Sequence, residues 1–463
     1  MNTNKKISSF GFFAMTAALF VTVYEYPTFA DMGKSLIFFL LLSGFCFFLP
    51  VALCAAELAT IEDPSYQEGG IFSWVGKVLG EKFGFAAIFF QWIQITVGFV
   101  TMLYFIIGTL SVVFNVPVIN DNMYVKFLIV VLSFWLITIL QFKGTQITEK
   151  IAKFGFSIGI VLSVIIMSIL AIKYFSNGNH ISLNYQKSDF IPNKKSWGML
   201  TSFILGYMGV EASAPHITKL NNYSKTYPKI MIVLVFVAVG LTTLGSCIVS
   251  MVLPGNISAN AGVIDAFRQL ISPGKISWGV ILLGLMISFG IIAQISSWIV
   301  SPTEGLRFVA TKGLLPQKFT KVNKAGVPIP LLILQGIVVT IWAAVLTFSS
   351  GSSGGNMSYQ IALNLTGMIY LVGYILFFIS YFIIITKHKD LKRAYQLPGG
   401  KIGKVIIAGM GLLLTIGALV TAFMVPTTIS SQQSSVYLIT LTISFIVTIM
   451  LPFVFYKLYK KRI

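Results

Sequence analysis

The chain has 463 residues, of which 56% are hydrophobic and 10% are charged, whereas soluble proteins carry about 25% charged residues. Most of it is therefore expected in lipid, as an all-α integral membrane protein. The formal net charge is +19, but the basic residues fall in short loops between apolar spans, which is typical of membrane orientation signals and argues against nucleic-acid binding. The 3 cysteines lie in apolar spans and there are only 3 histidines, so neither a disulfide framework nor a metal site is predicted.

Twelve apolar segments are long enough to cross a bilayer, because a spanning helix needs about 20 apolar residues. The predicted spans cover approximately residues 10–29, 35–60, 83–114, 124–142, 151–175, 197–214, 230–253, 276–300, 330–348, 359–386, 402–424 and 436–456. The first has no clear cleavage site, so we interpret it as a spanning helix rather than a signal peptide. No stretch between spans is long enough to fold alone, which predicts a single transmembrane domain over residues 1–463.

The positive charges predict how these spans are oriented. With the N-terminus inside the cell, about three quarters of the 33 Lys and Arg residues fall on the inner side. Both termini are therefore expected in the cytoplasm. The sequence lacks a Gly-x-x-x-x-Gly-Lys-Ser/Thr phosphate loop, which argues against an ATP-hydrolysing motor.

The sixth span carries an ionisable residue at membrane depth. Glu211 follows Gly206 and Gly209 and precedes Pro215. A charged side chain at the centre of a spanning helix costs about 2.5–3.5 kcal/mol and usually marks a pathway or a partner. The glycines and the proline weaken the helix, which predicts two half-helices with free backbone groups beside a cavity. The alternative is a kinked helix in which Glu211 merely pairs with a neighbour.

The first span ends in a similar polar interruption, YEYPT at residues 24–28. Interrupted helices five spans apart indicate an inverted-repeat transporter with a binding site near the membrane midplane, unless they coincide by chance. The two repeats would cover about residues 10–175 and 197–386, with an extra helix pair at about 402–456. The phenol of Tyr24 can hydrogen-bond a polar substrate, although tyrosines also form interfacial aromatic belts.

Two pairs of residues each share a helix face because their members lie four positions apart. Gln294 and Trp298 belong to the eighth span, where an amide can hydrogen-bond a ligand and an indole can close over it. Tyr370 and Tyr374 belong to the tenth span and could line a wall of the same cavity. Ordinary packing would account for any one of these residues. Their joint occurrence with two interrupted spans favours a substrate site.

Several strings of the sequence are distinctive. They are VYEYPTF at residues 23–29 and YMGVEASA at 207–214, with FFAMTA at 12–17, LCAAE at 53–57, EGG at 68–70, SWIV at 297–300 and LPGG at 397–400. In these strings the chain resembles the bacterial glutamate/GABA antiporters of the amino acid–polyamine–organocation superfamily, and the similarity runs from about residue 10 to residue 456.

The resemblance implies a leucine-transporter-like fold with 12 transmembrane helices, a five-plus-five inverted repeat and broken helices 1 and 6. It implies exchange of external glutamate for internal GABA by alternating access across the bacterial plasma membrane, without a cofactor. A cytoplasmic amino-acid decarboxylase would be the functional partner in acid resistance. Matching positions imply a substrate path lined by Tyr24, Glu211, Trp298, Tyr370 and Tyr374, with Gly206 and Gly209 in the sixth-helix break. Glu211 would then be a candidate acid sensor.

The sequence departs from the family pattern in two places. The eighth helix of the family usually has Glu four residues before the Trp, whereas this chain has Gln294, which changes the charge of the site. Family members with strong pH gating carry a longer cytoplasmic C-terminus, whereas this sequence ends soon after the twelfth span, so closure at neutral pH is not expected.

Other functions remain as alternatives. Gln294 favours exchange of another amino acid with its amine, or glutamine-like uptake, as the runner-up. A channel would conduct without saturation or stimulation by internal substrate. A membrane enzyme would need a nucleophile, metal or cofactor motif, and the sequence shows none.

Overall fold

The structure is a computed structural model that describes residues 8–67, 69–144, 151–179, 192, 194–253, 255, 257–349, 355–426 and 429–460. Glu68 of the EGG string lies outside the described residues. Within them the chain is helical, with one isolated antiparallel bridge between Ile61 and Arg393 and no strand.

The helices of the first part of the chain lead up to the second predicted interruption. They are α1 (Ser9–Phe20), α2 (Tyr26–Ala30), η1 (Gly33–Ser35), α3 (Leu36–Ser43), η2 (Gly44–Phe48), α4 (Leu49–Ala59), α5 (Pro64–Gln67), α6 (Ile71–Leu79), α7 (Glu81–Val113), α8 (Val118–Asp121), α9 (Met123–Gln141), η3 (Gly155–Leu162), α11 (Ser163–Ser176), η5 (Lys194–Met199) and α12 (Leu200–Leu205).

The helices of the second part follow this interruption. They are η6 (Val210–Lys219), α13 (Tyr223–Val252), α14 (Gly262–Ile271), α15 (Trp278–Thr311), η7 (Gln317–Thr320), α16 (Ile329–Ser349), α17 (Gly355–Lys387), α18 (Gly400–Thr421) and α19 (Ser434–Lys460).

In the part of the chain that the structure describes, 10 helices are long and apolar enough to cross a membrane. They lie in ten of the predicted spans. The first and sixth predicted spans contain shorter pieces instead. The first is divided into α1 and α2, which are separated at residues 21–25, and the sixth into α12 and η6, separated at residues 206–209. The second interruption falls where the sequence predicts it, whereas the first begins three residues before the predicted YEYPT string, whose residues 26–28 are helical in α2.

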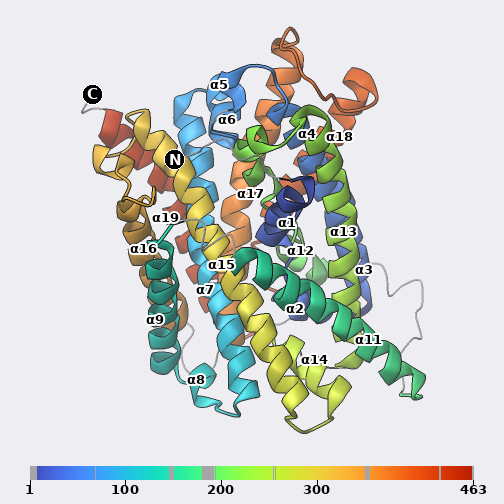
Figure 1. Cartoon of the computed structure of the whole chain (residues 1–463). Coiled ribbons are helices and arrows are strands. Elements are labelled where there is room, and N and C mark those ends of the chain that lie inside the picture. Colours follow the sequence, from blue (N-terminus) through green and yellow to red (C-terminus); the bar gives the residue numbers. More distant parts are fainter. Residues whose placement is uncertain are drawn as a thin grey trace.

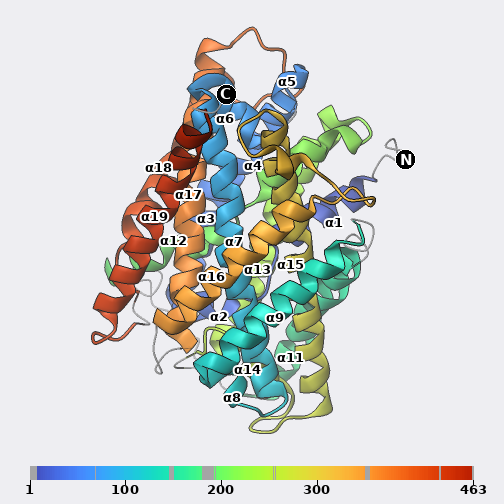
Figure 2. The same ribbon diagram turned by 90° about the vertical axis from the view of Figure 1, so that its left-hand side faces the viewer.

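The helices differ in how much of their surface is buried. α7 is almost entirely enclosed by other helices, whereas α18 and α19 expose most of their apolar side chains, including Leu413 and Ile443. These two helices pack against α17 and lie along one edge of the molecule (Figure 2). Because apolar side chains outside and polar side chains inside suit a lipid environment, the exposed faces of α18 and α19 are expected to contact lipid.

The start of α1 and the end of α19 lie in the same half of the molecule, which also carries α5 and α6 (Figures 1 and 2). α8 and α14 lie in the opposite half.

Close contact between glycines positions α15. Gly290 on α15 faces Gly159 on η3, and a side chain on either residue would collide with the opposite backbone. Small residues at such a crossing let two membrane helices approach closely. As a result α15 lies where its next turns, which carry Gln294 and Trp298, reach the end of α1.

Candidate substrate site

The interruption of the first span leaves backbone carbonyls without helical partners. α1 ends at Phe20, and side chains of other helices bind the freed oxygens. Leu19 O accepts hydrogen bonds from Gln294 Nε2 at 3.0 Å and Trp298 Nε1 at 2.6 Å, and Tyr24 O accepts one from the hydroxyl of Tyr359 at 2.7 Å. Because unsatisfied backbone groups are costly at membrane depth, α15 and α17 stabilise this break directly.

Gly209 makes the second interruption possible. Its φ of +109° is a conformation that side chains disfavour. An added Cβ would also lie 2.9 Å from Cη2 of Trp298. The Gly209 N–H donates to the hydroxyl of Tyr374 at 2.8 Å. Only glycine therefore permits both the turn and the close approach of the indole.

The carboxylate of Glu211 is held by neutral groups. Its side chain is 1% exposed. Oε1 accepts hydrogen bonds from the hydroxyl of Tyr370 and from Gln91 Nε2, the latter at 3.1 Å. Oε2 accepts one from the hydroxyl of Tyr374 at 2.6 Å. None of the ion pairs between described residues includes Glu211. Glu211 does pair with its neighbours, but in a helix that breaks rather than one that only kinks.

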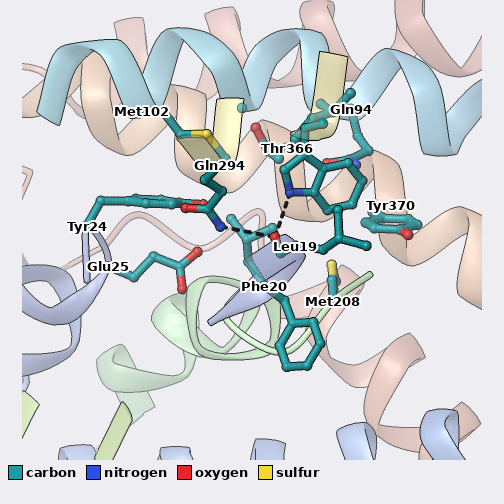
Figure 3. A pocket seen from close by; sticks show the side chains of 14 residues that line it. Leu19, Phe20, Tyr24, Glu25, Gln94, Met102, Met208, Gln294, Thr366 and Tyr370 are labelled. Carbon is teal, nitrogen blue, oxygen red and sulfur yellow. Dashed lines mark hydrogen bonds between the residues drawn. The ribbon is translucent and has the colours of Figure 1, made fainter. Parts of the chain in front are cut away.

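A small cavity lies between the two interruptions, with room for about one water molecule. The side chains around it come from both interrupted spans and from α7, α15 and α17 (Figure 3). The lining residues are Leu19, Phe20, Tyr24, Glu25, Gln94, Ile95, Gly98, Met102, Leu205, Met208, Gln294, Trp298, Thr366 and Tyr370.

The structure divides the predicted site residues into two layers. Tyr24, Gln294, Trp298 and Tyr370 line the cavity. The other four are not among its lining residues. They are Gly206 and Gly209 in the sixth-span break, and Glu211 and Tyr374, which are linked to each other and to Tyr370. The hydroxyl of Tyr370 connects Glu211 to the cavity wall.

Sequence reasoning passed over two polar residues at this site, Gln91 and Gln94, and recorded Glu25 only as part of the polar interruption of the first span. Gln94 and Glu25 line the cavity, and Gln91 donates to Glu211. Gln91 and Gln94 are amides three residues apart in an otherwise apolar span, which puts them on neighbouring positions of one face. Polar side chains inside a spanning helix usually face the protein interior, so this spacing was a usable signal.

A second buried carboxylate, Glu57, lies away from the cavity. Lys404 Nζ lies 2.6 Å from its Oε1 and Arg393 Nη1 lies 3.6 Å from the same atom. The hydroxyl of Tyr381 and the backbone N–H of Leu397 both donate to Oε2, at 3.0 and 2.9 Å. This Glu57 cluster joins α4 to α17, to α18 and to the segment between those two helices.

A helical membrane protein with a buried cavity between two interrupted helices has the architecture of a secondary transporter. The family model described as amino acid permease matches residues 7–445 of the chain. The chain therefore belongs to the amino acid permease family.

Relatives within this class are close. The chain is 51% identical to the glutamate/gamma-aminobutyrate antiporter of Lactococcus lactis subsp. lactis (strain IL1403), over 99% of this chain and 92% of the relative. It is 50% identical, with the same coverage, to the protein of that name from Lactococcus lactis subsp. cremoris (strain MG1363). An uncharacterized transporter of Legionella pneumophila is 29% identical over 100% of this chain and 99% of the relative.

Proposed function

We propose that this protein is an antiporter that exchanges external glutamate for internal GABA. The observation that carries the proposal is the identity of 51% and 50%, over nearly the whole chain, to two glutamate/gamma-aminobutyrate antiporters. The polar side chains in the wall of the cavity between the interrupted spans support it, because glutamate and GABA each combine an ammonium with at least one carboxylate and need buried polar partners.

The proposed architecture has twelve spans in two inverted repeats, about residues 10–175 and 197–386, with an additional pair at about 402–456. The interruptions at residues 21–25 and 206–209 occupy corresponding places in these repeats. Both termini would be cytoplasmic, which the placement of the start of α1 and the end of α19 in one half of the molecule supports. The protein would lie in the bacterial plasma membrane.

The transport cycle would be alternating access around the cavity. The cavity has room for about one water molecule, so a glutamate can enter only after the surrounding helices separate. The two interruptions supply the hinges. Trp298 lies between them, since it donates to Leu19 and packs on Gly209, and it is well placed to occlude the ligand together with Tyr24.

The proposed site residues have different tasks. Tyr24, Gln294, Trp298 and Tyr370 contact the substrate, and Gly206 and Gly209 shape the break. Glu211 and Tyr374 act through Tyr370, with Glu211 as the acid-sensing group. In the cell, exchange would be coupled to a cytoplasmic decarboxylase that converts glutamate to GABA and consumes a proton, which is the basis of acid resistance.

Counterflow in proteoliposomes tests the exchange. Purified protein is loaded with unlabelled GABA, and uptake of labelled glutamate is followed at acidic and neutral pH, with empty and glutamine-loaded vesicles as controls. Glutamate uptake that requires internal GABA is the expected result. It should occur at both pH values if no C-terminal segment closes the substrate path at neutral pH. Uptake that glutamine supports and GABA does not would refute the substrate pair. It would instead favour the alternative that Gln294 suggests, an exchanger for another amino acid or amide.

A further inference from the structure

Two oxygen acceptors in the cavity lack a positively charged partner. The first is the carboxylate of Glu25, which is 2% exposed and lines the cavity. None of the ion pairs between described residues includes Glu25. The ionisable side chains that interact with it are the phenols of Tyr24, Tyr26, Tyr207 and Tyr359, which are neutral near pH 7.

The second acceptor is Oε1 of Gln294. This side chain is 4% exposed, and its Oε1 has no hydrogen-bond partner in the part of the chain that the structure describes. The backbone fixes which way the amide faces. The atom 3.0 Å from Leu19 O must be Nε2, because two carbonyl oxygens cannot bond to each other. Oε1 is therefore directed away from Leu19 O. A buried acceptor left without a donor costs about 1–3 kcal/mol.

Both acceptors lie on the same side of the cavity, beside the ring of Tyr24, while Tyr370 lies on the opposite side (Figure 3). The position of Glu25 depends on the sixth-span break. A Cβ on Gly206 would lie 2.6 Å from Glu25 Oε2. The carboxylate is thus held between the first interruption, to which it belongs, and the glycine that opens the second.

We infer that Glu25 and Gln294 Oε1 form the subsite that binds the ammonium group of the transported molecule. A ligand group that binds between Glu25 and Gln294 Oε1 must bring several N–H donors and a positive charge. An ammonium group supplies three donors and the charge. A carboxylate in the same place would face the like charge of Glu25 and one further acceptor, Gln294 Oε1. The inference rests on the proposed function and extends it, since glutamate and GABA share an ammonium group and differ in their carboxylates.

The subsite makes the ammonium group, rather than the second carboxylate, the feature that every substrate must have. Competition against labelled GABA in proteoliposomes tests this with glutamate, unlabelled GABA and glutarate, which is glutamate without its ammonium group. Glutamate and GABA are expected to compete, and glutarate is not. Equal competition by glutarate and glutamate would overturn the subsite and needs no variant.

Variants then assign the subsite to Glu25. Glu25→Gln is expected to raise the inhibition constant of GABA by about tenfold or more, because a charge-assisted hydrogen bond is lost, and Glu25→Asp to raise it less. Glu304→Gln is the matched control, since Glu304 lies on α15 and pairs with Arg307 at a partly exposed position. Thermal melting of each purified variant verifies folding. A folded Glu25→Gln protein with an unchanged inhibition constant for GABA would refute the assignment.

Ligand-induced shifts of the melting temperature separate this inference from the proposed exchange. They are measured with GABA, glutamate, glutamine and glutarate, and they require no transport. Glu25-dependent stabilisation by amines but not by glutarate would support the subsite even if glutamate and GABA fail to exchange. Stabilisation by glutarate alone, or by none of the amines, would overturn the subsite whether or not exchange occurs.

Discussion

Glu57 and Glu211 are equally hidden, at 0% and 1% exposure, yet their surroundings are opposite. Glu57 has two cations, Lys404 and Arg393, besides two neutral donors. Glu211 has two phenols and one amide. A carboxylate paired with fixed cations is stable only in its ionised form, which suits a permanent contact between helices. A carboxylate held only by neutral donors can gain a proton without leaving an unpaired cation, which suits a group that changes during transport.

The largest expected effect is on stability, at the Glu57 cluster. Lys404→Met removes the closer cation and leaves Glu57 with Arg393 at 3.6 Å. Removing one partner of a buried ion pair costs about 3–5 kcal/mol, so a marked fall in melting temperature is expected.

The double variant Glu57→Gln with Lys404→Met is the control for this prediction. It removes the charges of Glu57 and Lys404 together, and should recover part of the lost stability because the Glu57 carboxylate no longer lacks its closer cation. Arg393, which loses its carboxylate partner in the double variant, still donates to the backbone oxygens of Ile384 and His388. A single variant as stable as wild type would show that the cluster does not hold α4 to α18.

The next effect is on transport, at Glu211. Glu211→Gln keeps an acceptor for one phenol and removes the ionisable group, so we expect folding to persist with a flattened pH dependence of exchange. Counterflow at a series of pH values measures it. If both the rate and the pH dependence equal those of wild type, Glu211 is not the acid sensor.

A smaller effect is expected at Trp298. Trp298→Phe keeps an aromatic ring beside Gly209 and removes one of the two donors to Leu19 O. A buried acceptor that loses every donor costs about 1–3 kcal/mol. Because Gln294 still donates to this oxygen, the protein should fold, with slower exchange and a modest loss of melting temperature. Exchange kinetics identical to those of wild type would exclude a role in occlusion.

The smallest effect is expected at an ion pair outside these buried sites. Glu304 and Arg307 are 2.7 Å apart and about one third exposed. Pairs of this kind contribute about 0–1 kcal/mol, so Glu304→Gln should change neither melting temperature nor exchange appreciably. A fall in melting temperature as large as that of Lys404→Met would mean that burial does not determine how much each carboxylate contributes to stability.

The sequence by itself determined the membrane class, the positions of the long spans and which two spans are interrupted, although the first break begins three residues before the predicted string. These features depend on local composition, since a run of apolar residues, a glycine pair or a proline acts on its own segment. The sequence also predicted Glu211, Gln294 and Trp298 as notable polar or aromatic residues within spans.

Only the tertiary structure decided what these residues contact. It placed Glu211 behind Tyr370, paired it with Gln91 from a distant span, and directed Gln294 and Trp298 to one carbonyl of α1. It also distinguished Glu57, whose cations lie more than 300 positions along the chain, from Glu25 in the cavity wall. Hydrogen bonds and ion pairs form between atoms that are close in space, and helix packing, rather than the order of residues, sets those distances.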